Sequence, residues 1–90
     1  MSIMWWNGRV PVRGDRVGII EMVGDVQKAS QKLLGWNLGG PRWAQAVQAC
    51  MEALEGRITP DEARDAFREA AAEQGMYLPN LAVSPQVTLQ

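Results

Sequence analysis

The sequence lacks histidine altogether and contains a single cysteine, Cys50. Histidine is the commonest metal ligand and the usual general base near neutral pH, so its absence argues against metal sites and catalytic triads. One cysteine also excludes a disulfide within the chain. Acid–base candidates remain in Glu52, Glu55 and Asp61, but their helical spacing is that of a solvated surface. We therefore expect no metal, no cofactor and no enzymatic activity.

Long apolar runs are missing as well. No segment approaches the roughly 18 consecutive apolar residues that a membrane-spanning helix needs. Residues 1–7 have neither a basic start nor a long apolar stretch, so we expect no secretory signal. These absences favour a protein of the bacterial cytoplasm with no membrane partner.

The net charge is only −1, yet the charges are unevenly distributed. Residues 1–43 carry six basic and three acidic side chains, whereas residues 44–90 carry three and seven. A protein so close to neutral has no general field for attracting nucleic acid. The polarity can be satisfied within one monomer or between monomers packed head to tail.

The first regular element predicted is a β-hairpin. Residues 9–12 alternate polar and apolar side chains, and residues 17–23 are rich in β-branched side chains. Between them, Arg13-Gly14-Asp15-Arg16 has the composition of a glycine-centred turn. Pro11 cannot donate a backbone hydrogen bond, so we expect the first strand to lie at a sheet edge.

Two helices are predicted to follow the hairpin. Asp25 is placed to cap a helix over residues 26–34, which Gly35 would end in a left-handed conformation. The expected buried face of this helix is Val26, Ala29, Leu33 and Leu34. Gly39-Gly40-Pro41 opens the second helix, and Gly56 ends it. The apolar stripe of the second helix, with its first residue as the expected anchor, is Trp43, Ala46, Val47, Cys50, Met51 and Leu54.

The glycine-rich start of the second helix has two interpretations. It could hold an anion, because free amides and the helix dipole point toward it. Its spacing matches neither the nucleotide-binding loop nor the dinucleotide pattern, and Pro41 removes a donor. We favour a structural turn.

The third helix has the clearest start signal. Thr59 can cap it, Pro60 takes the first helical position, and Glu62 is placed to complete a capping box. Phe67 is the large side chain on a face otherwise made of alanines, and Gly75 closes the helix.

The predicted fold class is therefore α+β. A two-stranded antiparallel hairpin is followed by three α-helices (ββααα), with an extra C-terminal strand as an open alternative. We divide the chain into an apolar N-terminal segment (1–8), one small α+β domain (9–76) and an uncharged C-terminal tail (77–90).

Apolar residues at both ends of the chain indicate an interaction function. Trp5 and Trp6 either cover an edge of the core or bind a partner, and the tail is disordered, lies over its own core or adds to a neighbour's sheet. The leading hypothesis is a non-catalytic interaction or regulatory protein that self-associates, most simply as a homodimer. The alternative is a nucleic-acid-binding module that uses the N-terminal arginines and tryptophans. The candidate surface is Trp5, Trp6, Arg9, Arg13, Arg16, Tyr77, Leu81 and Val83.

These residues resemble a family of small, mainly rhizobial proteins known as domain of unknown function 982. The resemblance covers about residues 9–76. It implies a hairpin followed by three helices, and it implies no activity or catalytic residues because the family has none assigned. It rests on the order and spacing of Pro11, Val12, residues 23–34, Trp36, Gly40, Ala46, Cys50, Ala53, Leu54, Gly56, Ala63, Arg64, Ala66, Phe67, Ala70, Ala71, Glu73 and Gly75.

Overall fold

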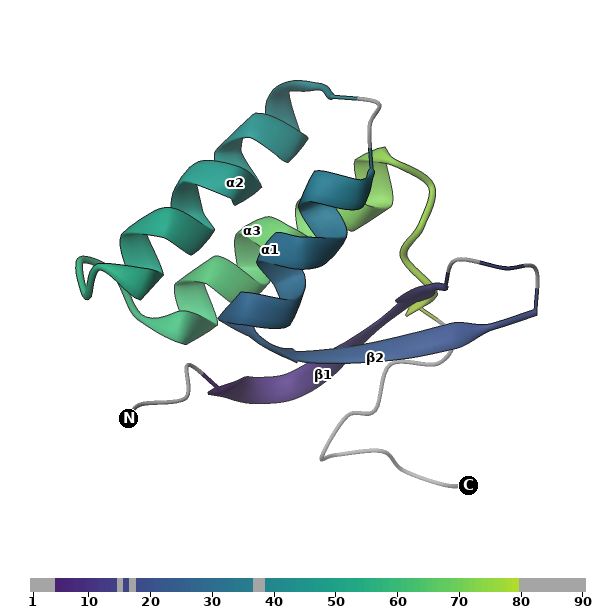
Figure 1. Ribbon diagram of the computed structural model, residues 1–90, viewed down its shortest axis with the longest axis horizontal. Coiled ribbons are helices and arrows are strands. Elements are labelled where there is room, and N and C mark those ends of the chain that lie inside the picture. Colours follow the sequence, from purple (N-terminus) through teal and green to yellow (C-terminus); the bar gives the residue numbers. More distant parts are fainter. Residues whose placement is uncertain (1–4, 15, 17, 37–38, 80–90) are drawn as a thin grey trace.

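The computed structural model describes residues 5–14, 16, 18–36 and 39–79. A hairpin of β1 (Trp5–Arg13) and β2 (Ile20–Asp25) is followed by α1 (Val26–Gly35), α2 (Pro41–Leu54) and α3 (Pro60–Glu73), as Figure 1 shows. This confirms the predicted ββααα arrangement. No helix in the described ranges is both long and apolar enough to cross a membrane.

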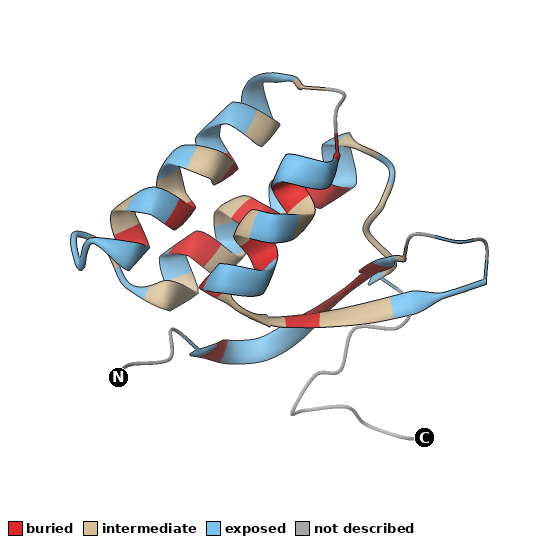
Figure 2. Ribbon diagram, in the orientation of Figure 1, coloured by how far each residue is buried: buried red, intermediate tan, exposed pale blue. Residues whose placement is uncertain are grey.

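The helices cover one face of the hairpin in two layers (Figure 1). α1 packs on β2 and α3 packs on β1, while α2 lies on the far side of α1 and α3. Figure 2 shows buried residues where these layers meet and exposed residues along the outer side of α2. The opposite face of the hairpin is therefore left uncovered by the helices.

Phe67 of α3 is completely buried at the centre of the core. The ring of Trp36 stacks on it with centroids 5.4 Å apart and an interplanar angle of 18°. The ring of Trp6, from β1, lies 5.8 Å away at a tilt of 34°. This aromatic cluster joins the hairpin to the helices. Trp43, the expected anchor, is only half-buried, and its Nε1 donates to the carbonyl oxygen of Leu33 at 2.7 Å.

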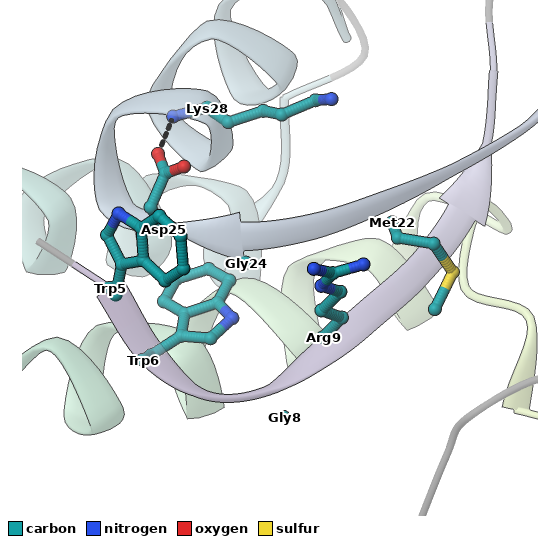
Figure 3. Close-up of a pocket in the computed structure, with 8 residues that line it drawn as sticks. All are labelled: Trp5, Trp6, Gly8, Arg9, Met22, Gly24, Asp25 and Lys28. Carbon is teal, nitrogen blue, oxygen red and sulfur yellow. Dashed lines mark hydrogen bonds between the residues drawn. The ribbon is translucent and has the colours of Figure 1, made fainter.

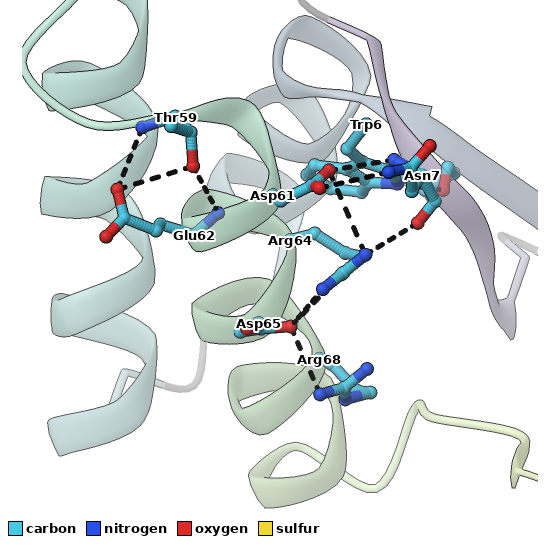
Figure 4. Close-up of polar contacts among 9 residues, drawn as sticks. Trp6, Asn7, Thr59, Asp61, Glu62, Arg64, Asp65 and Arg68 are labelled. Carbon is cyan, nitrogen blue, oxygen red and sulfur yellow. Dashed lines mark hydrogen bonds and ion pairs between the residues drawn. The ribbon is translucent and has the colours of Figure 1, made fainter.

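Local sequence explains where α1 and α3 begin. The Asp25 carboxylate accepts a hydrogen bond from the Lys28 amide at 2.7 Å. The Thr59 hydroxyl accepts from the Glu62 amide at 3.2 Å, while the Glu62 carboxylate accepts from the Thr59 amide at 2.9 Å (Figure 4). Both predicted caps are confirmed, and they satisfy N–H groups that helix starts leave free.

The start of α2 is closed by a side chain from α3. Gly40 has no side chain with which to cap the helix, and the Glu73 carboxylate instead accepts from the amides of Arg42 at 3.3 Å and Trp43 at 3.0 Å. A Cβ on Gly40 would lie 2.6 Å from Glu73 Oε1, so glycine makes room for this contact. The turn is structural as predicted, and its anion site is filled by the protein's own carboxylate.

Three large apolar side chains that the helical pattern placed in the core are exposed. Leu34 is 67% exposed, Met51 is 51% exposed and Leu54 is 43% exposed. For Met51 and Leu54 the prediction was wrong because α2 packs on α3 through small side chains, which allow the two helices to approach closely. The buried residues of α2 are Ala46, Cys50 and Ala53.

The end of α1 also differs from the prediction. Gly35 is the last helical residue and does not have a positive φ. The helix ends because Trp36 is extended, with φ −89°, as its ring turns into the core.

The edge of β1 that faces away from β2 is paired near its end. The Leu78 amide donates to the Pro11 carbonyl at 3.0 Å, and the Arg13 amide donates to the Met76 carbonyl at 2.9 Å. Residues 76–78 thus form a short antiparallel bridge to β1. Since Pro11 has its carbonyl on this side, its missing N–H weakens this edge and not the ladder with β2.

The same edge is closed near its start by α3. The Asn7 amide donates to Asp61 Oδ1 at 2.8 Å, and the Asn7 carbonyl accepts from Arg64 Nη1 at 2.8 Å (Figure 4). Both backbone groups that could pair with another strand at this residue are therefore already bonded.

Candidate functional site

β1 and β2 lose their regular pairing at a large bulge. Trp5 pairs with Asp25 and Val10 with Val23, so residues 6–9 of β1 lie opposite Gly24 alone. The extra residues turn at a glycine, residue 8, with φ +77°. Bulges of this kind re-aim side chains and are common beside functional sites.

The bulge creates a hollow of about 670 Å³ on the hairpin. This volume lies within the roughly 300 to 1,000 Å³ typical of binding pockets. Figure 3 shows the side chains that surround it. The hollow is lined by Trp5, Trp6, Gly8, Arg9, Met22, Gly24, Asp25 and Lys28.

Two tryptophans form the apolar wall of the hollow in different ways. Trp6 is buried, and its Nε1 donates to the Val23 carbonyl at 3.1 Å, so its position is fixed by the core. Trp5 is 64% exposed although it precedes a buried residue. Met22, half-buried on β2, extends the apolar lining. An exposed tryptophan beside an apolar hollow is the composition of a binding surface.

The charged groups around the hollow leave it positive. Arg9 lies across Gly24, where a Cβ would be 3.3 Å from Arg9 Cγ. Its guanidinium has no hydrogen bond or ion pair with any residue in the described ranges. The Asp25 carboxylate is already engaged as the cap of α1, and Lys28 Nζ lies 4.0 Å from the Glu21 carboxylate. Arg9 is therefore the cation most available to a bound group.

The structure brings together only part of the predicted surface. Trp5, Trp6 and Arg9 meet at the hollow. Arg13 instead donates to the Gly75 carbonyl at 3.2 Å, and Arg16 is exposed in the hairpin connection. Half-buried Tyr77 belongs to the bridge on the opposite edge of β1. The remaining two predicted residues, Leu81 and Val83, lie outside the described residues.

A comparison with family models identifies the family of the chain. A model described as "Protein of unknown function (DUF982)" matches residues 10–78. The chain belongs to the DUF982 family. This confirms the resemblance noted from the sequence. No curated protein and no solved structure matches the chain.

The residues that match the DUF982 model include some of those that line the hollow. Met22, Gly24 and Lys28 lie inside the matched range, whereas Trp5, Trp6 and the rest of the β1 wall precede it. Sequence reasoning missed the β2 side of the hollow. Gly24, a glycine within a strand pattern, was the available signal, because such a glycine marks a bulge or a close approach.

The acid–base candidates of this DUF982 protein lie outside the residues that line the hollow. Asp61 accepts from Asn7, and Glu52 accepts from Gln48 at 3.1 Å. Glu55 forms an ion pair with Arg57 at 3.4 Å. Among the described residues, no group of three or more acidic, cysteine or histidine side chains could hold a metal ion.

Cys50 lies on the buried face of α2, within the apolar core. Burial raises the pKa of its thiol from 9.0 to about 11, because the thiolate would be poorly solvated there. The thiol is therefore protonated and unreactive near neutral pH, as predicted for a small buried side chain.

Proposed function

We propose that this DUF982 protein is a small, non-catalytic interaction protein of the cytoplasm that self-associates through the outer face of its hairpin. The observation that carries the proposal is Trp5, which is 64% exposed beside the apolar hollow. Tryptophans in such positions contribute disproportionately to binding because they bury a large rigid surface.

Self-association is supported by the amount of apolar surface on so short a chain. A single core in 90 residues gives modest stability, and burying further apolar side chains in an interface adds to it. The described residues include six large apolar side chains that are exposed: Trp5, Ile19, Ile20, Leu34, Met51 and Leu54.

Light scattering of the full-length protein across a wide concentration range tests this proposal. We expect a monomer–dimer equilibrium and expect Trp5→Ala to raise its Kd by about 30-fold, the loss of about 2 kcal/mol that defines a hot spot. Leu34→Ala is the matched control, because Leu34 is equally exposed but outside the hollow. A wild-type mass that stays monomeric, or equal effects of the two variants, would contradict the proposal.

Nucleic-acid binding is the second candidate, and one observation favours it. Trp5 and Arg9 share the hollow, so a base could stack on the indole while the guanidinium bonds a phosphate. The dispersal of Arg13 and Arg16 weakens this candidate, since the positive surface is small. A labelled single-stranded oligonucleotide that shows no mobility shift at low salt would eliminate it.

A further inference from the structure

The C-terminal end of α2 has a chemistry opposite to that of the hollow. Met51 and Leu54 are 51% and 43% exposed there, and both were expected in the core. Glu55, which follows them, is exposed, and Glu52 is half-buried. This surface, which we call the α2 end, combines apolar side chains with carboxylates.

The electrostatics of the α2 end are unfavourable in an isolated chain. The last turn of α2 contains no basic residue. Carboxylates at a helix C-terminus add to the negative end of the helix dipole. Arg57 offsets this only in part, because it and Glu55 are 71% and 54% exposed and their pair is screened by water. A cation from another molecule would stabilise this end further.

The hollow has the complementary composition. Trp5 and Met22 supply apolar walls, and Arg9 supplies a guanidinium with no partner among the described residues. A guanidinium beside an apolar wall suits an apolar side chain that is followed by a carboxylate. Residues 51–55 of the α2 end provide that order.

We propose that the occupant of the hollow is a second copy of this chain, which places Met51 and Leu54 against Trp5 and Glu55 against Arg9. This inference rests on the proposed function, self-association, and names the two surfaces that meet. Each copy carries both surfaces. In Figure 1 the last turn of α2 and the start of β1 lie toward the same end of the long axis. A dimer with twofold symmetry makes this contact twice, once at the hollow of each copy.

Charge reversal at the two ends of the contact tests this pairing. Arg9→Glu and Glu55→Arg each place like charges opposite one another in both contacts of the dimer, so each variant alone should raise the Kd at least about tenfold. An equimolar mixture of the two variants should dimerise with nearly the wild-type Kd. In the mixed dimer one contact is wild type and the other has its charges exchanged, so both are attractive.

Two controls separate the contact from general effects of charge. Arg16→Glu alters an exposed arginine in the hairpin connection, and Gln45→Arg alters an exposed residue nearer the start of α2. Neither should change the Kd more than about twofold, a difference of about 0.4 kcal/mol. Circular dichroism verifies that all variants remain folded.

The possible results separate the pairing from self-association itself. Recovery of dimers in the mixture supports the pairing, because a folding defect in either variant would not be corrected by mixing. A wild-type dimer that both single variants leave intact overturns the pairing and leaves self-association standing. Single variants that are monomeric and stay so when mixed also overturn it. A monomeric wild-type protein overturns both proposals.

Discussion

At the scale of single residues, Phe67 is the fully buried ring on which two tryptophans pack. It contacts the rings of Trp6 and Trp36, which come from β1 and the end of α1. Trp43 lies at the margin, half-buried and hydrogen-bonded to the Leu33 carbonyl. Stability should therefore depend more on Phe67 than on Trp43, contrary to what the sequence indicates.

Phe67→Ala is expected to lower the free energy of unfolding by about 3 to 5 kcal/mol, because the cavity leaves two indole rings without their partner. Trp43→Ala is expected to cost about 1 to 3 kcal/mol, since part of that ring is already in water. Urea denaturation followed by circular dichroism measures both. A larger loss for Trp43→Ala would contradict this ranking of the two residues.

At the scale of elements, α2 depends on α3 for its start. The carboxylate of Glu73 bonds the amides of Arg42 and Trp43, a role that a residue just before the helix usually fills. The contact spans 30 residues of sequence, so it also fixes the relative position of the two helices.

Glu73→Ala is expected to lower the free energy of unfolding by about 1 to 2 kcal/mol, through loss of the cap and of a charge that favours the helix dipole. Glu69→Ala is the control on the same helix. Glu69 pairs with Arg42 at 3.4 Å, but both side chains are over half exposed, so this change should cost at most about 0.5 kcal/mol. Equal losses in urea denaturation would show that Glu73 does not act as a cap.

The elements were predictable where their signals are local. Thr59, Pro60 and Glu62 encode the start of α3 within four positions, and the structure contains the predicted capping box. The Glu73 cap was not predictable, because its partners are distant in the sequence. The buried face of α2 was also predicted incorrectly. Large apolar side chains such as Met51 and Leu54 are expected in a core, but the face of α2 that is buried carries small side chains.

At the scale of the whole molecule, the structure shows where the basic first half and the acidic second half of the sequence place some of their charged side chains. Arg9 and Lys28 lie around the hollow, while Glu52 and Glu55 lie at the α2 end. The sequence predicted the polarity but not the hollow. The alternating pattern places the strand start near residue 9, whereas β1 begins at Trp5 because the bulge takes in the intervening residues.

Self-association is expected to weaken several-fold as sodium chloride rises from about 0.1 M to 1 M, because the Debye length falls from about 10 Å to 3 Å. Sedimentation of the wild-type protein at several salt concentrations measures the change. The monomer's resistance to urea serves as the reference for general effects of salt. Dimers that tighten with salt would indicate a purely apolar contact and contradict the role of Arg9 and Glu55.

The closure of the β1 edge by α3 has a consequence for how the chain is made. Asn7 and Arg64 are 57 residues apart, so at roughly 5 to 20 residues per second the ribosome adds Arg64 roughly 3 to 11 s after it adds Asn7. During that interval the backbone N–H and C=O of Asn7 lack their hydrogen-bond partners in α3, and an unpaired strand edge pairs readily with other chains. Synthesis of α3 is therefore the step that ends the exposure of the nascent hairpin to aggregation.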